Sequence, residues 1–217
     1  GLSIVVNKEN DWVKTLTVDE LKKIFLDGGN VKSWSDVRAG FPDVPIKMYI
    51  PGTDSGTFDY FKEVVAGKTG SIRADVSASE DDNVLVRGIA GDKGAIGFFG
   101  CAYYFENTDT LRAVAIDGGS GPVLPTSETI ANGTYEPFSR PLFIYVSTKA
   151  AQRPEVKAFV EFYLDNAADL AEDVGYVRLP DSIYALAKQK FANKHTGTHF
   201  LTPAGEKKKG ALTDIYK

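Results

Sequence analysis

The sequence has 217 residues, of which 43% are hydrophobic, 12% aromatic and 25% charged, as in an ordinary folded domain. Its formal net charge is −4, with acidic and basic residues mixed along the chain, which argues against a nucleic-acid-binding protein. The single cysteine, Cys101, excludes an intrachain disulfide and a zinc site built on thiolates, and no apolar run reaches the ~18 residues that span a bilayer.

The first predicted elements alternate between strand and helix. Leu2–Val6 is typical of a strand and does not resemble a signal peptide. Thr17 and Glu20 have the spacing of a capping box, which predicts that a helix begins there, and Gly28-Gly29 is expected to end it. The alternating run Ile46–Ile50 predicts the next strand.

The middle of the chain repeats this order. A turn-rich loop, Pro51–Thr57, leads into a predicted helix that runs to Val65. Ser79 is predicted to cap a further helix, with acidic residues in its first turn, that ends near Ala90. Gly94–Phe99 predicts a buried strand, with glycines where another backbone approaches closely.

The last third is expected to be richer in helix. Leu111–Ile116 and Leu142–Val146 are predicted strands, separated by a loop with one short helix. Two long helices are predicted over Pro154–Asp173 and Asp181–Asn193, and the tail after them is polar. The side chains expected to point inward from these two helices are Phe159, Phe162, Tyr163, Leu170, Ile183, Leu186 and Ala187. Strands alternating with helices predict an α/β fold with a mainly parallel sheet.

The loop before the helix at Gly56 has the chemistry of an anion site. The first amides of a helix lack intrahelical partners and point along the positive end of its dipole. Ser55 and Thr57 add hydroxyl groups, and Gly56 lets an anion approach the backbone. The alternative is that Ser55 only caps the helix.

The sequence offers few other groups of residues that could form a metal site or a catalytic site. His195 and His199 have i, i+4 spacing, but they lie in a tail without a neighbouring acid, so a solvated tail is favoured over a zinc site. Glu80-Asp81-Asp82 fits the start of a helix better than a metal site. Cys101 has no histidine near it, and no nucleophile elbow is present. No enzyme activity, cofactor or metal is therefore expected.

One stretch, Pro51-Gly52-Thr53-Asp54-Ser55-Gly56-Thr57-Phe58-Asp59-Tyr60-Phe61, resembles the phosphate-binding loop of the PstS-like family of periplasmic binding proteins. The resemblance continues through Ser79–Val86 and Gly94–Gly100, and near the end of the chain through Leu179–Asp181 and Gly197-Thr198. It therefore covers essentially the whole chain. The family supplies the ligand-binding subunit of phosphate ABC importers.

The resemblance implies a fold of the periplasmic-binding-protein type II class, with two α/β lobes and central mixed sheets. Residues 1–7 would be a crossing strand, and residues 8–139 a complete lobe that carries the anion-binding loop. Residues 140–217 would form the return strand and the C-terminal helices of the other lobe. Hinge motion about the crossing strands would close the lobes on the ligand.

Inorganic phosphate is the implied ligand, held by Ser55, Gly56 and Thr57 through amides and hydroxyls. Asp54 would accept the proton that phosphate retains near neutral pH. Many relatives carry an arginine four residues before the serine, where this chain has Pro51. Arg73 is the expected substitute, because a guanidinium matches a phosphate edge; a solvated surface charge is the alternative.

The resemblance also implies a location and partners. The protein would be periplasmic or a cell-surface lipoprotein of a bacterium, and it would deliver phosphate to the membrane permease. The resemblance further implies that roughly the first third of a typical member, with about half of the ligand contacts, would be absent from this sequence. The first lobe would then be incomplete, and its exposed sheet edges and apolar faces would favour self-association.

Three functions remain open on the sequence. The first is the phosphate-binding subunit of an ABC importer. The second is a phosphate-ester hydrolase on the same anion site, which would need a nucleophile or two metal ions that the sequence does not offer. The third is a surface or scaffold protein that has kept the fold and lost its ligand.

Overall fold

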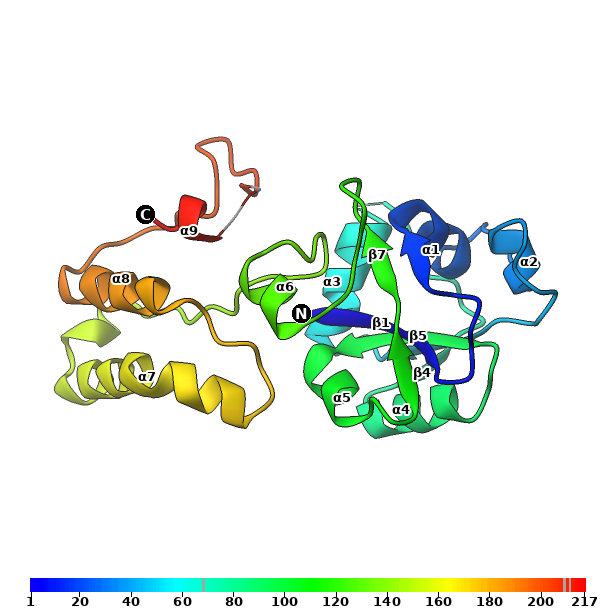
Figure 1. The fold of residues 1–217 in the computed structure, drawn as a ribbon. Helices are drawn as coiled ribbons and strands as arrows, with labels where there is room; N and C mark the ends of the chain where they lie inside the picture. The colour runs from blue at the N-terminus through cyan, green and yellow to red at the C-terminus, as the bar shows by residue number, and fades with distance from the viewer. Residues whose placement is uncertain (68, 209, 211) are drawn as a thin grey trace. The chain divides into compact units, whose positions relative to one another are not determined.

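A computed structural model describes residues 1–67, 69–208, 210 and 212–217 (Figure 1). The chain divides into two compact units. The first unit contains residues 1–126 and 135–139, and the second contains residues 127–134 and 140–217. Within the described residues, no helix is both long and apolar enough to cross a bilayer. The assignment of residues 1–7, 8–139 and 140–217 to a crossing strand and two lobes stays a prediction.

The first unit is built on a five-stranded sheet with the strand order β4-β3-β5-β1-β6. Its strands are β1 (Leu2–Asn7), β3 (Lys47–Pro51), β4 (Ser77–Ser79), β5 (Ala95–Gly100) and β6 (Leu111–Ala113). β3 runs parallel to β4 and β5, whereas β1 is antiparallel to β5 and β6. The sheet is therefore mixed, and the prediction of a mainly parallel sheet is wrong. Alternation with helices predicts parallel pairing only for strands that the helices connect, and β1 is not such a strand.

The predicted strand over residues 111–116 is two strands in two sheets. β6 ends at Ala113, and the chain then continues into a small sheet of β2 (Thr15–Thr17), β7 (Ala115–Asp117) and β8 (Pro122–Val123). Between them, the Val114 amide donates to the Ile4 carbonyl over 2.9 Å. An apolar run therefore did not reveal where the chain changes sheets.

Helices cover both faces of the large sheet. The helices of this unit are α1 (Val18–Phe25), α2 (Trp34–Val37), α3 (Gly56–Val65), α4 (Asp82–Ala90) and α5 (Cys101–Glu106). Successive side chains of β5 point to opposite faces, as pleating requires. Phe98 stacks on Phe61 of α3, with 3.8 Å between ring centroids, and contacts Phe25 of α1 at 5.6 Å. Phe99 joins the cluster that buries Leu85 and Ile89 of α4.

Close packing requires glycine at two positions of the predicted strand Gly94–Phe99. A Cβ atom on Gly97 would lie 2.4 Å from the carbonyl oxygen of Tyr49, on the neighbouring strand β3. A Cβ atom on Gly94 would lie 2.3 Å from the carbonyl oxygen of Pro45. Both distances are too short for real atoms, so the expectation of close backbone approach is confirmed.

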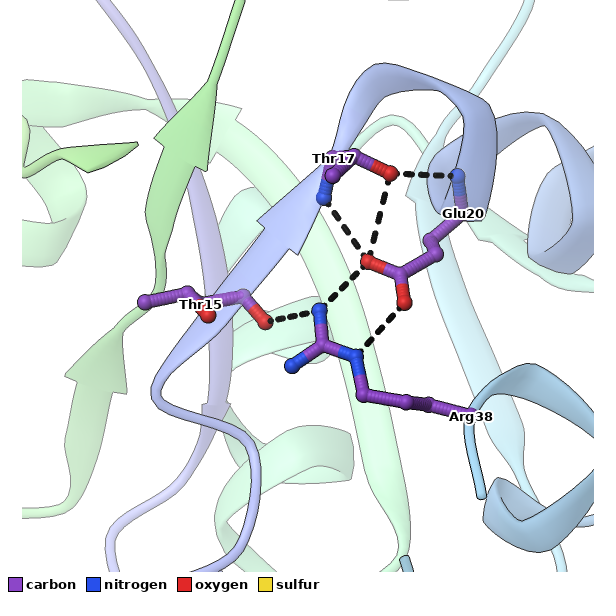
Figure 2. A network of polar contacts seen from close by, with 4 residues as sticks. All are labelled: Thr15, Thr17, Glu20 and Arg38. Carbon is purple, nitrogen blue, oxygen red and sulfur yellow. Dashed lines mark hydrogen bonds and ion pairs between the residues drawn. The ribbon is translucent and has the colours of Figure 1, made fainter. Parts of the chain in front are cut away.

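The predicted capping box of α1 is present and is part of a larger network (Figure 2). The Thr17 hydroxyl accepts the Glu20 amide at 3.1 Å, and Glu20 Oε2 accepts the Thr17 amide at 2.9 Å. The same carboxylate accepts Arg38 Nε at 2.7 Å and Arg38 Nη2 at 2.6 Å, while Arg38 also donates to the Thr15 carbonyl. This network joins β2, α1 and the end of α2.

The second unit is helical. It contains α6 (Ser127–Ala131), the 3-10 helix η1 (Ala150–Gln152), α7 (Pro154–Asp173), α8 (Asp181–Ala192) and α9 (Leu212–Ile215). The two long predicted helices are thus confirmed as α7 and α8. The predicted strand at Leu142–Val146 is wrong, because these residues form no strand. A strand needs hydrogen-bonded neighbours, and within the described residues the second unit supplies only an isolated bridge, Leu201 to Lys207.

Many of the large apolar side chains of the second unit are exposed. Phe159, Phe162, Tyr163 and Leu170 were expected to be buried, but they are 66%, 60%, 38% and 49% exposed. The buried residues of α7 are instead Val160 and Ala167, and Ile183 of α8 is buried as predicted. Leu142, Phe143, Ile144 and Tyr145 are also exposed. We call these eight exposed side chains the apolar face.

Candidate functional site

The candidate site is the loop between β3 and α3. β3 ends at Pro51, and α3 begins at Gly56 after a short turn. Ser55 is the N-cap, and its hydroxyl accepts the Thr57 amide at 3.2 Å. The capping role considered for Ser55 is therefore realised. A cap hydroxyl and a first-turn amide lie together at the positive end of a ten-residue helix.

The turn before the helix is fixed by neighbouring backbone. The Ser55 amide donates to the Gly52 carbonyl at 3.1 Å, and the Gly52 amide donates to the Ser79 carbonyl of β4 at 3.0 Å. Glu80 adds a third anchor, because its Oε1 accepts the Asp54 amide at 3.3 Å. A Cβ atom on Gly52 would lie 1.7 Å from the same carboxylate oxygen, so a glycine lets Glu80 lie against the turn.

Glu80 was not identified as a site residue from the sequence. It was assigned to the first turn of a helix that Ser79 would cap, and that assignment is wrong. Asp81 is the N-cap of α4, and its carboxylate accepts the Asn83 amide at 2.9 Å. Ser79 instead ends β4, where it pairs with Pro51 of β3. The strand pairing brings Glu80 to the loop, and sequence spacing carries no signal of it.

The loop is accessible from outside the first unit. Asp54 and Gly56 are exposed, and Ser55 and Thr57 are partly exposed. The start of α3 is therefore not blocked by a packed neighbour, as an anion site at a helix N-terminus requires. The Ser55 hydroxyl can exchange its bond with the Thr57 amide for a bond to an oxyanion, which would release that amide as a second donor.

The electrostatic surroundings of the loop are acidic. Burial raises the pKa of the Asp82 carboxyl, and the nearby carboxylates of Asp81 and Glu80 raise it further. Asp54 adds another carboxylate to the turn. Fixed N–H dipoles and hydroxyls, rather than net positive charge, must therefore supply the attraction for an anion at this loop.

Arg73, the predicted charge partner, is engaged elsewhere in the first unit. Its guanidinium forms a bidentate pair with Asp75, with Nε and Nη2 at 2.5 and 2.6 Å from the two carboxylate oxygens. Its Nη1 donates to the carbonyls of Ile24 and Val31 at 3.3 and 2.8 Å. The Asp75 hydrogen bond raises the pKa of Arg73, against the smaller effect of burial. Most of its donors are thus engaged, two of them by Asp75, and one ties Arg73 to the Ile24 carbonyl near the end of α1.

Arg73 also lines a depression of about 290 Å³. The other lining residues are Leu26, Asp27, Gly28, Gly29, Asn30, Lys32, Ala74 and Asp75. None of them belongs to the loop Asp54–Thr57. The structure therefore brings Asp54, Ser55, Gly56 and Thr57 together and places Arg73 at a separate feature, and its contact with phosphate stays a prediction.

The histidine pair of the tail was considered as a metal site. The rings of His195 and His199 stack with 5.4 Å between centroids, and His199 Nε2 lies 2.7 Å from Lys190 Nζ. Burial lowers the pKa of His199, and the nearby Lys190 lowers it further. Among the residues that the structure describes, no group of three or more His, Cys, Asp or Glu side chains is placed to hold a metal ion.

Comparison with known proteins finds a matching family profile and several similar sequences. A profile described as "PBP superfamily domain" matches residues 1–167. Protein SphX of Synechocystis sp. is 48% identical over 203 residues, which cover 92% of this chain and 60% of that protein. The phosphate-binding protein PstS of Staphylococcus haemolyticus is 40% identical over 186 residues, which cover 85% of this chain and 57% of that protein.

A solved structure shares the fold. The crystal structure of a protein from Planctomyces limnophilus, described as a possible phosphate binding protein, superposes with a TM-score of 0.81 at 44% identity. The match covers 90% of this chain and 70% of that one. The chain spans about 60% of the length of the curated relatives it matches. On the profile match and this likeness, the chain belongs to the PBP superfamily, and the relatives it matches there include phosphate-binding proteins.

Proposed function

We propose that this protein is the solute-binding subunit of an ABC importer and that it captures inorganic phosphate at the N-terminus of α3. The observation that carries the proposal is the accessible Ser55-Gly56-Thr57 sequence at the start of that helix. The names of its relatives support the choice of phosphate among small anions. The protein acts by binding and delivery, not by catalysis.

The first-turn amides and the hydroxyls of Ser55 and Thr57 donate to the phosphate oxygens. Gly56 has no side chain, so the anion reaches the backbone. Asp54 accepts the proton of hydrogen phosphate, which sulfate lacks, and in this way selects for phosphate. Arg73 contributes positive charge only if it exchanges Asp75 for the ligand, which makes it the least supported member of the site.

The cellular setting follows from the family. A solute-binding subunit works outside the cytoplasmic membrane, as a periplasmic or lipid-anchored protein, and hands its ligand to a membrane permease. We therefore propose that location and that partner for the protein.

The proposal is tested by titration calorimetry with phosphate and with sulfate. Ser55→Ala and Thr57→Val each remove a hydroxyl, and a charge-assisted hydrogen bond contributes about 1.5–3 kcal/mol. Each variant should therefore weaken phosphate binding by about 10- to 100-fold. Asp54→Asn should reduce the preference for phosphate over sulfate. Ser77→Ala, an exposed hydroxyl on β4, is the matched control and should bind as the wild type does.

The outcomes separate the three functions. Unchanged affinity in Ser55→Ala and Thr57→Val would remove the loop from the site. Absence of phosphate binding at millimolar concentration would favour a scaffold that has lost its ligand. Turnover of a chromogenic phosphate ester that Ser55→Ala abolishes would favour the hydrolase. Circular dichroism must accompany each titration, since Ser55→Ala also removes a helix cap of about 1 kcal/mol.

The apolar face of the second unit supports one further part of the proposal. Phe159, Phe162 and Tyr145 are 66%, 60% and 88% exposed, which is a high exposure for three large side chains of one small unit. Exposed apolar surface is typical of sites that contact another protein or that promote association. We propose that they drive self-association of this 217-residue chain.

A further inference from the structure

Tyr60 connects the helix of the candidate site to the segment through which the chain leaves the first unit. It lies on α3 four residues after Gly56, one helical turn beyond the proposed anion. Its hydroxyl lies 2.6 Å from the carbonyl oxygen of Pro137 and 3.1 Å from that of Ser139. The single hydroxyl proton is thus shared between two carbonyls of this segment, residues 135–139, which we call the exit segment.

The exit segment is tied to the first unit at several other points. The Leu2 amide donates to the Phe138 carbonyl at 2.9 Å, and the Tyr135 hydroxyl donates to the Leu2 carbonyl at 2.9 Å. Phe138 is fully buried, and its ring stacks with that of Phe61, with centroids 5.9 Å apart. Ser139 is the last residue of the first unit, and the chain passes directly from it into residues 140–217 of the second.

We infer that Tyr60 is a positioning residue that couples occupancy of the anion loop to the conformation of the exit segment. The inference rests on the proposed function. α3 is one continuous helix of ten residues, so we expect an adjustment at its first turn to be carried to the next turn. A hydrogen bond of 2.6 Å weakens steeply when its geometry changes, so a small shift of α3 alters the hold on Pro137 and Ser139.

The hydrogen bonds of the Tyr60 hydroxyl, rather than the ring contact of Phe61, are the basis of this coupling. Phe61 also links α3 to the exit segment, through its ring contact with Phe138, but an apolar contact tolerates sliding. The Tyr60 hydroxyl bond is directional, and it reaches two backbone carbonyls of the exit segment, those of Pro137 and Ser139. Removal of this hydroxyl should therefore uncouple the segment while leaving the packing of α3 intact.

Hydrogen exchange of the amides of residues 138–140, with and without inorganic phosphate, tests the inference in Tyr60→Phe. Tyr176→Phe removes an exposed hydroxyl of the second unit and serves as the control. Without phosphate, Tyr60→Phe should exchange about fivefold faster at these amides, as expected for one lost hydrogen bond. In the wild type and in the control variant, saturating phosphate should change the exchange rates of the amides of residues 138–140. In Tyr60→Phe this response should be lost, with phosphate affinity within about threefold of the wild type.

The outcomes distinguish the inference from the proposed function. If the wild type binds phosphate and exchange at residues 138–140 does not respond, the coupling is refuted and the proposed function stands. If Tyr60→Phe retains the full response, Tyr60 is not the coupling residue. If the wild type binds no phosphate, the proposed function fails and the coupling fails with it. Equal exchange of the ligand-free wild type and Tyr60→Phe would show that the hydroxyl does not hold the segment.

Discussion

Replacement of Glu20 by glutamine keeps the shape of the side chain and removes its charge. The residue is 9% exposed, and its two oxygens accept both Arg38 donors and the Thr17 amide (Figure 2). An amide has only one oxygen, so its NH₂ group must face a donor of Arg38 or of Thr17. At least one charge-assisted hydrogen bond is lost in either orientation.

The size of the effect follows from this geometry. Such a bond contributes about 1.5–3 kcal/mol when a buried partner is left unsatisfied. The Arg38 side chain is 36% exposed, so water screens part of the interaction. We therefore expect Glu20→Gln to lower the free energy of unfolding of the first unit by about 2 kcal/mol. In urea this corresponds to a midpoint lower by about 1 M.

Both tryptophans, Trp12 and Trp34, belong to the first unit, so their fluorescence in urea follows its unfolding. Asp19→Asn is the matched control, because Asp19 lies on the same helix and pairs with Lys22 at 2.8 Å but is 83% exposed. It should leave the midpoint unchanged. Equal losses for Glu20→Gln and Asp19→Asn would refute the argument that burial gives the Glu20 pair its strength.

The stability difference between the wild type and Glu20→Gln should depend on pH. Burial raises the pKa of the Glu20 carboxyl, but the hydrogen bonds from Arg38 and Thr17 outweigh it and leave the pKa below its usual value. A carboxyl with a lowered folded pKa stabilises the fold above its unfolded pKa of about 4.3 and loses that contribution as the pH falls through the folded pKa. The wild type should therefore exceed Glu20→Gln by a constant margin at pH 5–8 (about 2 kcal/mol), and the margin should shrink below pH ~4.

Two further predictions concern the thiol and the apolar face. Burial raises the pKa of the Cys101 thiol to about 11. A disulfide reagent at pH 8 should therefore react with this thiol at least about 100-fold more slowly than with free cysteine, until urea unfolds the first unit. Rapid reaction of the folded protein would contradict the burial of Cys101. Light scattering after gel filtration should show the 217-residue chain above its monomer mass of 23.6 kDa, and Phe159→Ser with Phe162→Ser should shift it toward the monomer. A wild type that stays monomeric at high concentration would rule out self-association.

Features that depend on one turn of chain were predictable from the sequence. The capping box of Thr17 and Glu20 closes within three residues, so its hydrogen bonds are confirmed as predicted. The strand and helix on either side of the loop Pro51–Thr57 were predicted nearly to the residue. The residue at which α3 begins follows from the same local signals. These interactions require no knowledge of the rest of the fold.

Features that depend on distant partners were not predictable. Glu80 reaches the Asp54 amide from 26 residues away, and Tyr60 reaches Pro137 from 77 residues away. The helical spacing of Phe159 and Phe162 gives the apolar side of α7, but spacing does not say whether another element covers that side. Leu142–Val146 has the composition of a strand, and composition does not supply a neighbour for it.

The position of β1 between β5 and β6 has a consequence for synthesis of the protein. Leu2 pairs with Gly100 and Asn7 with Leu111, so this strand leaves the ribosome roughly a hundred residues before its partners. At about 5–20 residues per second, the interval is on the order of 5–20 s. During that time Ile4, Val5 and Val6, which are fully buried in the folded protein, face water on the nascent chain. A chaperone that binds short apolar segments therefore has a target at β1 during this interval.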